Sequence, residues 1–359
     1  MTRSRLFRIA ALAALLTGAG VPAAAVAAAP ASAATTTYTI TDLGSLGGGV
    51  TVATAINTSG QVTGYSYLPK KQGATVYHAF LWTNGKMTDL GELGGAGSPG
   101  GGLSEGHAIN DAGQVVGYAT DTAGDLDAAL WNGRKITLLP GLNPDAIGIN
   151  DSGQIIGVIN GEFIDSNGTQ TVLPDPPSLL TCNAVAINNN GQVTGDCSGQ
   201  EGTLNEFTPR GVVWTNDTPT VLPTLGGPCP SAALTCPEAF PTAINNNGQV
   251  TGTAATSTGA LDGFLWSNGT ITDLGPDFAP AAINDNGVIV GGAFDVNGVI
   301  DGGGFIDTDG TLQNLNTLIP AGSGFQIQSA TGINDNGQII ANATDTATGQ
   351  QHALLLTPN

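Results

Sequence analysis

Short apolar runs separated by turn residues recur along the chain from about residue 38 onward. The most regular unit is an Ile-Asn pair with Gly three residues after the Asn, followed by an apolar run such as Val115-Val116 or Ile339-Ile340. Asn suits the first position of a type I turn and Gly suits the fourth, where φ is positive, so the unit predicts a tight hairpin with a bulge on its return strand. It occurs seven times, at Asn57, Asn110, Asn150, Asn188, Asn245, Asn284 and Asn334.

A second apolar element follows each hairpin. It reads small-apolar-apolar-Trp in four copies, which end at Trp82, Trp131, Trp214 and Trp266 and include every Trp of the chain. Weaker copies are Phe163-Ile164, Phe305-Ile306 and Leu354-Leu355. Trp at one phase of a repeat indicates buried core strands, with a sugar-binding aromatic stripe as the alternative.

A fourth strand completes each repeat, and the number of fourth strands indicates how the first and last repeats join. Six of the seven Trp-type strands are followed by a short turn, such as Asn84-Gly85, and a further strand that ends on Leu, such as Leu90; the last, 353–356, runs out of chain. The missing strand matches Tyr38 to Gly44 near the N-terminus. A repeat of about 46 residues split in this way predicts a ring rather than an open array. We therefore expect an all-β fold, a seven-bladed β-propeller of four-stranded antiparallel blades whose last blade is closed by the N-terminal strand.

Three motifs of the first repeat resemble a known family. His78-Ala79-Phe80-Leu81-Trp82, Thr88-Asp89-Leu90-Gly91 and Leu93-Gly94-Gly95 are similar to the HAF-repeat family of predicted extracellular repeat proteins. The resemblance covers most of the chain after residue 33 and implies an extracellular repeat protein. It implies no substrate or catalytic residue, and the motif's His is kept only at His78 and His352.

The N-terminal segment has the pattern of a secretory signal peptide. Arg3, Arg5 and Arg8 precede an apolar, Ala-rich stretch that ends in Ala31-Ser32-Ala33, a small-x-small cleavage pattern. We expect residues 1–33 to be a signal peptide, residues 34–359 to form one propeller domain, and the protein to be secreted. The alternative is a membrane anchor, which Gly and Pro residues interrupt, and no later run approaches the ~18 apolar residues that a span requires.

Charge narrows the classes of partner. The chain has 9 Lys and Arg against 28 Asp and Glu. Nucleic acids and anionic membranes select for basic residues, so neither nucleic acid nor membrane insertion is expected. A hydrophobic fraction of 40% with 10% charged residues also argues against intrinsic disorder.

An even number of cysteines in an exported chain predicts disulfides. Cys182 and Cys197 flank the hairpin that turns at 188–191, at nearly equal distances from the turn, so they are expected to bridge neighbouring strands. Cys229 and Cys236 are expected to close one loop between blades, and four free thiols are the alternative.

Cofactor and metal signals are weak. No cofactor is expected, with calcium as the alternative because Asp295, Asn297 and Asp301 alternate along one segment and carry oxygen ligands. The three His residues are scattered and no Cys/His cluster exists, which excludes a typical zinc site.

Catalytic signals are also weak. Gly102-Leu103-Ser104-Glu105-Gly106 matches the GxSxG pattern of hydrolases and is followed by His107, but we expect a Gly-rich loop here rather than the strand-to-helix turn that the motif needs. No catalytic residue is assigned.

The expected geometry indicates a binding surface. Tight Asn-Gly turns should share one face of the disc, and longer loops that differ between blades should share the other, as in scaffolds that present binding loops. Those loops carry many acids, so that face should be acidic, with solubility as the alternative role of these acids.

The leading interpretation is a secreted, non-catalytic binding propeller for an extracellular glycan or protein. The alternatives are a secreted polysaccharide hydrolase or lyase acting at the channel mouth and a purely structural surface protein. The longer loops are 65–77, 91–106, 119–127, 174–183, 196–210, 223–241, 253–262, 292–302 and 316–329.

Overall fold

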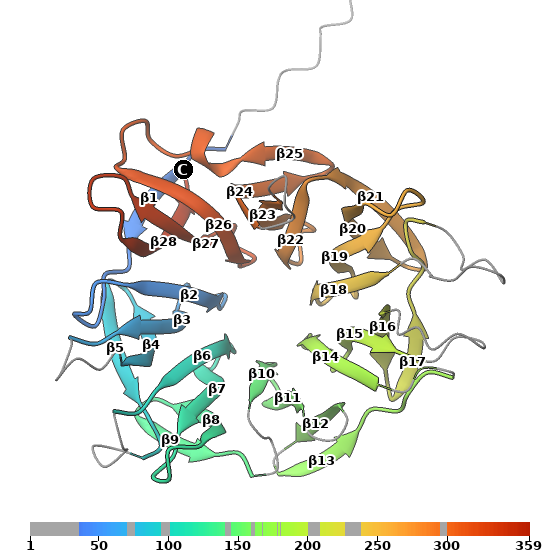
Figure 1. Ribbon diagram of the computed structural model, residues 1–359, viewed down its shortest axis with the longest axis horizontal. Helices are drawn as coiled ribbons and strands as arrows, with labels where there is room; N and C mark the ends of the chain where they lie inside the picture. Colours follow the sequence, from blue (N-terminus) through green and yellow to red (C-terminus); the bar gives the residue numbers. More distant parts are fainter. Residues whose placement is uncertain are drawn as a thin grey trace, which may run out of the picture. The chain divides into compact units, whose positions relative to one another are not determined.

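The computed structural model shows a β-propeller (Figure 1). It describes residues 36–69, 76–94, 101–140, 145–158, 162–166, 168–177, 179, 181–199, 209–226, 238–294 and 300–359. Residues from Thr36 to Asn359 form one compact unit. The regular elements of the described residues are β-strands apart from one turn of 3-10 helix, η2 (Leu315–Thr317). The predicted signal peptide lies outside the described residues.

The strands pair in order of sequence as four-stranded antiparallel sheets, which we number as blades 1 to 7. Blade 1 consists of β2 (Thr51–Ile56), β3 (Val62–Tyr67), β4 (Tyr77–Thr83) and β5 (Lys86–Gly91). Blade 2 consists of β6 (Ser104–Ile109), β7 (Gln114–Thr120), β8 (Leu126–Asn132) and β9 (Lys135–Leu138). Blade 3 consists of β10 (Ala146–Ile149), β11 (Gln154–Val158), β12 (Glu162–Ser166) and β13 (Thr169–Val172). Blade 4 consists of β14 (Thr181–Ile187), β15 (Val193–Ser198), β16 (Arg210–Thr215) and β17 (Thr218–Val221).

The remaining blades have the same order. Blade 5 consists of β18 (Ala239–Ile244), β19 (Val250–Ala255), β20 (Leu261–Ser267) and β21 (Thr270–Pro276). Blade 6 consists of β22 (Phe278–Ile283), β23 (Ile289–Phe294), β24 (Ile300–Thr308) and β25 (Thr311–Asn314). Blade 7 consists of β26 (Phe325–Ile333), β27 (Ile339–Asp345), β28 (Gln351–Pro358) and β1 (Tyr38–Asp42). The first strand of each blade lies toward the centre of the ring (Figure 1). The predicted β-propeller of four-stranded antiparallel blades is confirmed.

The N-terminal strand occupies the outer position of blade 7. β1 pairs antiparallel with β28, from Tyr38 opposite Pro358 to Asp42 opposite Leu354. Asp42 accepts a 2.8 Å contact from His352, and Asp89 makes the same 2.8 Å contact with His78 in blade 1. β1 therefore pairs with β28 in the same way that β5 pairs with β4. More than 300 residues separate β1 from β28 in the sequence.

The core lies between neighbouring blades. Trp131, 1% exposed, belongs to a cluster that joins Val115 of its own blade to Ala79 and Leu90 of blade 1. Trp82 and Trp214 are likewise buried, and Trp266 is half-buried against the core of blade 5. The prediction that the Trp residues are core residues is confirmed for these positions.

The Asn-x-x-Gly turns have the predicted geometry. In each, the Gly N–H donates to the Asn carbonyl, as from Gly60 to Asn57 at 3.0 Å, and the seven Gly residues have φ between +73° and +78°. Each hairpin also has a bulge, but its extra residue lies on the first strand, before the turn, as Thr54 does between Ala53 and Ala55, so the prediction of a bulge on the return strand is wrong. The hairpins are therefore set by local turn chemistry.

The Asn side chains of these turns also join the blades. Asn57 Nδ2 donates to the carbonyl of Asn110 in blade 2, and the same contact recurs from each blade to the next until Asn334 donates to the carbonyl of Asn57. The donor–acceptor distances are 2.9 to 3.2 Å, and all seven Asn residues are buried. We call this closed set the asparagine ring: Asn57, Asn110, Asn150, Asn188, Asn245, Asn284 and Asn334.

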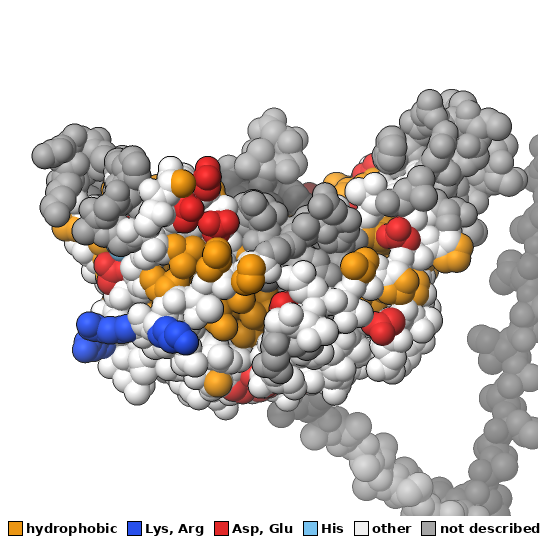
Figure 2. Space-filling model, turned by 90° about the horizontal axis from the view of Figure 1, so that it is seen from below, with side chains coloured by type: hydrophobic (Ala, Val, Ile, Leu, Met, Phe, Trp, Pro, Cys, Tyr) orange, Lys and Arg blue, Asp and Glu red, His pale blue; other side chains and the backbone are white. Residues whose placement is uncertain are grey.

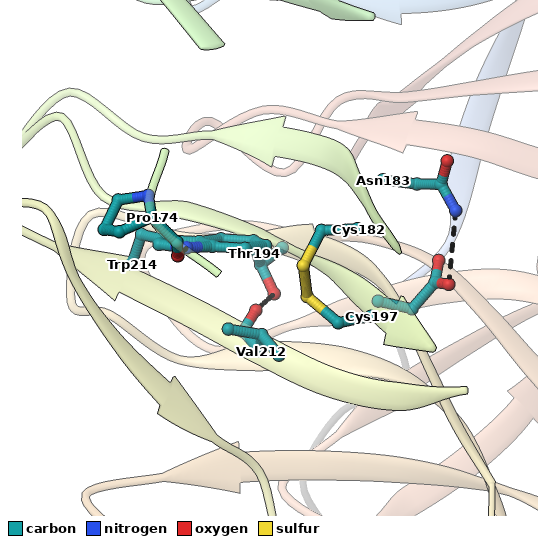
Figure 3. The surroundings of a disulfide bond; sticks show 8 residues. Pro174, Cys182, Asn183, Thr194, Cys197, Val212 and Trp214 are labelled. Carbon is teal, nitrogen blue, oxygen red and sulfur yellow. Dashed lines mark hydrogen bonds between the residues drawn. A yellow bond between two sulfur atoms is a disulfide. The ribbon is translucent and has the colours of Figure 1, made fainter. Parts of the chain in front are cut away.

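One predicted disulfide is present, between Cys182 of β14 and Cys197 of β15 (Figure 3). The two residues are directly opposite in the strand register, and their side chains pack in a core cluster with Trp214. The bridge therefore links the two inner strands of blade 4, as the turn position predicted. Cys229 and Cys236 lie outside the described residues, so their pairing stays a prediction.

Candidate functional site

On the face that carries the Asn-x-x-Gly turns, side chains of the turns bond to neighbouring blades and hold the ring together. A cavity of about 180 Å³ at the channel mouth is lined by the Ile-Asn pairs and by the residue after each Asn. Where that residue is Asp, its carboxylate accepts a backbone N–H from the preceding blade, as Asp111 does from Thr58 at 2.9 Å and Asp335 from Asp285 at 2.8 Å. These carboxylates thus have structural partners.

At the strand ends away from the Asn-x-x-Gly turns, blades 1 and 2 bring together four of the five tyrosines of the chain. Tyr65 and Tyr67 lie near the end of β3, and Tyr77 begins β4. Their ring centroids are 5.0 to 6.2 Å apart, so the three rings pack at tilted and edge-on angles. Tyr118 of β7 joins them through a 2.9 Å contact between its hydroxyl and that of Tyr77. All four side chains are half-buried and leave part of their surface accessible.

Charged groups adjoin these tyrosines. The Tyr118 hydroxyl donates to Glu105 Oε2 at 2.9 Å, and Glu105 Oε1 lies 3.6 Å from His107 Nε2. On its other side, His107 Nδ1 lies 3.1 Å from Oδ1 of Asp145, which directly precedes β10 of blade 3. The His107 ring also meets Tyr118 edge-on at 5.5 Å. We call this group, contributed by three blades, the tyrosine–histidine cluster: Tyr65, Tyr67, Tyr77, Glu105, His107, Tyr118 and Asp145.

Electrostatics fix the protonation states in this cluster. Burial favours neutral His107, but the hydrogen bonds and charges of Asp145 and Glu105 outweigh it and raise the pKa of His107 to about 9. Burial, Tyr77 and Glu105 raise the pKa of Tyr118. At neutral pH the cluster therefore presents a His107 imidazolium between the side chains of Asp145 and Glu105, beside a neutral Tyr118 phenol. A charged His107 does not act as a general base, and a neutral Tyr118 is a poor nucleophile.

Stability should depend on pH through His107. Its pKa is raised on folding from 6.5 to about 9, so its stabilisation is complete below pH 6.5 and is lost as pH rises through 9. We expect the free energy of unfolding to fall by about 3 kcal/mol more in the wild type than in His107→Gln over that range. Urea unfolding of both proteins at pH 6 and pH 9.5 measures the difference. An equal change in both proteins would contradict the assignment.

Ser104 of the GxSxG match has a structural role. It begins β6, so the expected loop is wrong from residue 104 onward. Its side chain is fully buried, donates to the Gly91 carbonyl at 2.6 Å, and accepts the Ala79 N–H at 2.9 Å. The motif therefore tethers blade 2 to blade 1 and provides no accessible nucleophile.

The calcium candidates are mostly outside the described part of the chain. Asp295 and Asn297 lie outside it, and Asp301 is placed in β24 without a description of its side chain. Among the described residues, no group of three or more His, Cys, Asp and Glu side chains has an arrangement that could hold a metal ion. The calcium alternative therefore stays a prediction.

The acidic surface differs in detail from the one predicted. Several acids assigned to loops belong to strands, including Glu105 of β6, Asp127 of β8 and Asp196 of β15. Burial and the carboxylates of Asp121 and Asp125 raise the pKa of Asp127, which reflects local crowding of acids. Seen edge-on, Lys and Arg side chains gather on one part of the rim (Figure 2). The exposed basic residues in the outer hairpins of blades 1 and 2 are Lys86, Arg134 and Lys135.

Comparisons with known proteins define the fold. No protein-family profile matches the chain, and no characterised protein sequence matches it. Among solved structures, the chain is similar to the β-propeller domain of the Trilobed protease from Pyrococcus furiosus, with 7% identity, a TM-score of 0.54, and coverage of 90% of this chain and 95% of that one. That domain is described as having an open velcro topology, whereas β1 and β28 pair here.

Two peptidases of known structure are also similar to this chain. One is a puromycin-hydrolyzing peptidase of Mycobacterium tuberculosis, with 12% identity, a TM-score of 0.50, and coverage of 84% of this chain and 52% of that one. The other is the acylaminoacyl peptidase of Pyrococcus horikoshii, with 8% identity, a TM-score of 0.51, and coverage of 88% and 53%. The chain thus spans about half the length of each peptidase. At these identities the likeness defines the β-propeller class and leaves catalytic and binding roles both open.

Proposed function

We propose that this chain is an exported, non-catalytic propeller of seven blades, closed by β1, that binds an extracellular glycan at the tyrosine–histidine cluster. The observation that carries the proposal is the gathering of four tyrosines from two blades beside Glu105 and His107. Sugar rings pack their C–H faces on aromatic rings, while charged groups bond their hydroxyls. A few fixed polar groups among aromatic side chains are typical of ligand sites.

Several further observations support this proposal. The cluster lies at the end of the blades away from the Asn-x-x-Gly turns, where the sequence predicts the variable loops. Its ionic groups hold one another in place, which reduces the ordering cost of binding. Export agrees with the Cys182–Cys197 disulfide and with the resemblance to the HAF-repeat family. In the described residues, no helix is long and apolar enough to cross a membrane.

Binding to a panel of neutral and acidic polysaccharides, measured together with any release of sugars, tests the proposal. We expect one class of polysaccharide to bind without cleavage, and Tyr77→Ala to weaken binding roughly tenfold, about 1.4 kcal/mol. Thr58→Ala is the matched control, since Thr58 is exposed on the turn face.

The other outcomes separate the alternatives. Release of sugars would support the hydrolase or lyase. Binding only to a protein would replace the glycan with a protein ligand. Absence of any ligand would support a structural role, and equal affinity of Tyr77→Ala and wild type would place the site elsewhere.

A further inference from the structure

The interface between blades 2 and 3 lacks an aromatic residue that other interfaces have. In blades 1, 2, 4 and 5 a Trp stands at the same register position, as Trp131 does opposite Val115. In blade 3 that position is Asp165, opposite Ile155. The Trp residues pack against the preceding blade, as Trp214 shows through its 2.8 Å hydrogen bond to the Pro174 carbonyl. Blade 3 therefore presents a carboxylate where an indole usually fills the interface.

A cavity of about 280 Å³ lies at this position. Leu130 and Leu139 of blade 2 and Ile149 and Ile155 of blade 3 provide an apolar wall, while Gln114, Asp151, Ser152 and Asp165 provide polar groups. An apolar cavity of ~150 Å³ is large enough to bind benzene, so this volume accommodates a bicyclic ring. The cavity borders the 151–153 turn, whereas the tyrosine–histidine cluster lies at the other ends of the strands of blades 1 to 3.

Asp165, one of two carboxylates that line this cavity, lacks a positive partner. Asp165 is 8% exposed, and its Oδ1 accepts the Gly168 N–H at 2.8 Å. Within the described part of the chain, no Lys, Arg or His forms an ion pair with it. A buried carboxylate without a cation is costly, and buried charges in proteins are normally paired. Asp151 also lines the cavity, but its carboxylate already accepts the Asp111 N–H and an Asn189 side-chain N–H, so the site offers too few oxygens for calcium, which takes six to eight oxygen ligands.

We propose that this cavity is a binding site for a small aromatic amine, whose ring replaces the missing indole and whose ammonium group pairs with Asp165. The apolar wall receives the ring and Asp165 receives the ammonium group, while Gln114 and Ser152 also line the cavity. Because the site is separate from the tyrosine–histidine cluster, it stands or falls independently of glycan binding.

Calorimetric titration of the full protein with tryptamine tests the site. We expect one equivalent to bind with a Kd of about 0.1 mM. Asp165→Asn keeps an acceptor for the Gly168 N–H but removes the charge, and it should raise the Kd roughly tenfold or more. Asp165→Trp should abolish binding by filling the cavity. Asp307→Asn is the matched control, because Asp307 occupies the same register position in blade 6 and also accepts a turn N–H, from Gly310 at 3.0 Å.

Three further probes define the ligand class. Indole-3-propionate has the ring but a negative charge, and butylamine has the charge without the ring; both should bind at least tenfold more weakly than tryptamine. Calcium chloride should neither bind with comparable affinity nor compete with tryptamine. Failure of wild type to bind tryptamine at millimolar concentration, unchanged affinity in Asp165→Asn, or equal binding of indole-3-propionate would each overturn the proposal.

Discussion

Deletion of residues 36–46 should abolish the folded monomer. The deletion removes β1, which pairs with β28 over five residues and buries Tyr38 and Leu43, each 4% exposed. Each of these side chains contributes about 1.5–3 kcal/mol through burial. The deletion also exposes the edge of β28, with its unpaired backbone groups, to other chains. The combined loss is a large part of the ~5–15 kcal/mol that holds a typical protein folded. We expect oligomers or an unfolded chain in size-exclusion chromatography and circular dichroism.

The control for this deletion is Thr41→Ala, an exposed position on the same strand. This substitution keeps the β1–β28 pairing and should leave the monomer and its thermal unfolding unchanged. If the deleted protein also stays monomeric with an unchanged unfolding temperature, β1 is not needed to hold blade 7 in the ring.

The repeat could be predicted from the sequence because its turns are local. Asn57 and Gly60 determine their hairpin through contacts within five residues, and the other six copies obey the same chemistry. The position of β1 was also predictable, because it matched the missing strand of the last repeat. The Cys182–Cys197 bridge followed from counting outward from one such turn. In each case, knowledge of the repeat and of its hairpin geometry was enough.

Contacts between blades could not be predicted in the same way. The Asn side chains were interpreted only as turn formers, whereas each also donates to a carbonyl 38 or more residues away. The sequence repeats the Asn but does not say which carbonyl its side chain reaches. That depends on the angle between neighbouring blades, which is a property of the assembled ring.

The candidate site was missed for a related reason. His107 was noted beside a long loop, but its partners Asp145 and Glu105 come from two different blades. A signal was present in Tyr65 and Tyr67, which alternate along one strand and so face the same side. Similarly, the weak copy of the Trp motif before Asp165 was visible, but the cavity beside it depends on how blade 2 packs against blade 3.

The asparagine ring leads to the second large effect, a strong loss of stability in Asn57→Ala. Asn57 Nδ2 donates to the Asn110 carbonyl at 3.0 Å and to Gln61 Oε1 at 2.8 Å, and its Oδ1 accepts the Gln61 N–H at 2.9 Å. Alanine removes all three hydrogen bonds at a buried position and takes away the acceptor of the Gln61 N–H, while the Asn110 carbonyl keeps its bond from the Gly113 N–H. Each loss costs about 1 kcal/mol, and more where a group stays unsatisfied. We expect a decrease of about 2–4 kcal/mol in the free energy of unfolding, measured by urea denaturation.

Two comparisons separate the ring from the turn. Ser59→Ala changes an exposed residue of the same turn and should stay within about 0.5 kcal/mol of wild type. Asn284 keeps the bond to the next blade, to the Asn334 carbonyl at 3.1 Å, but is followed by Val288 where the other turns have Gln. Asn284→Ala removes that bond and the two in which Asn284 Oδ1 accepts the Val288 and Asn286 N–H groups, three in all as in Asn57→Ala, so it should lower the free energy of unfolding by a similar amount. If Asn57→Ala unfolds like Ser59→Ala, the side-chain contacts between blades contribute little, and the ring is held by its apolar interfaces alone.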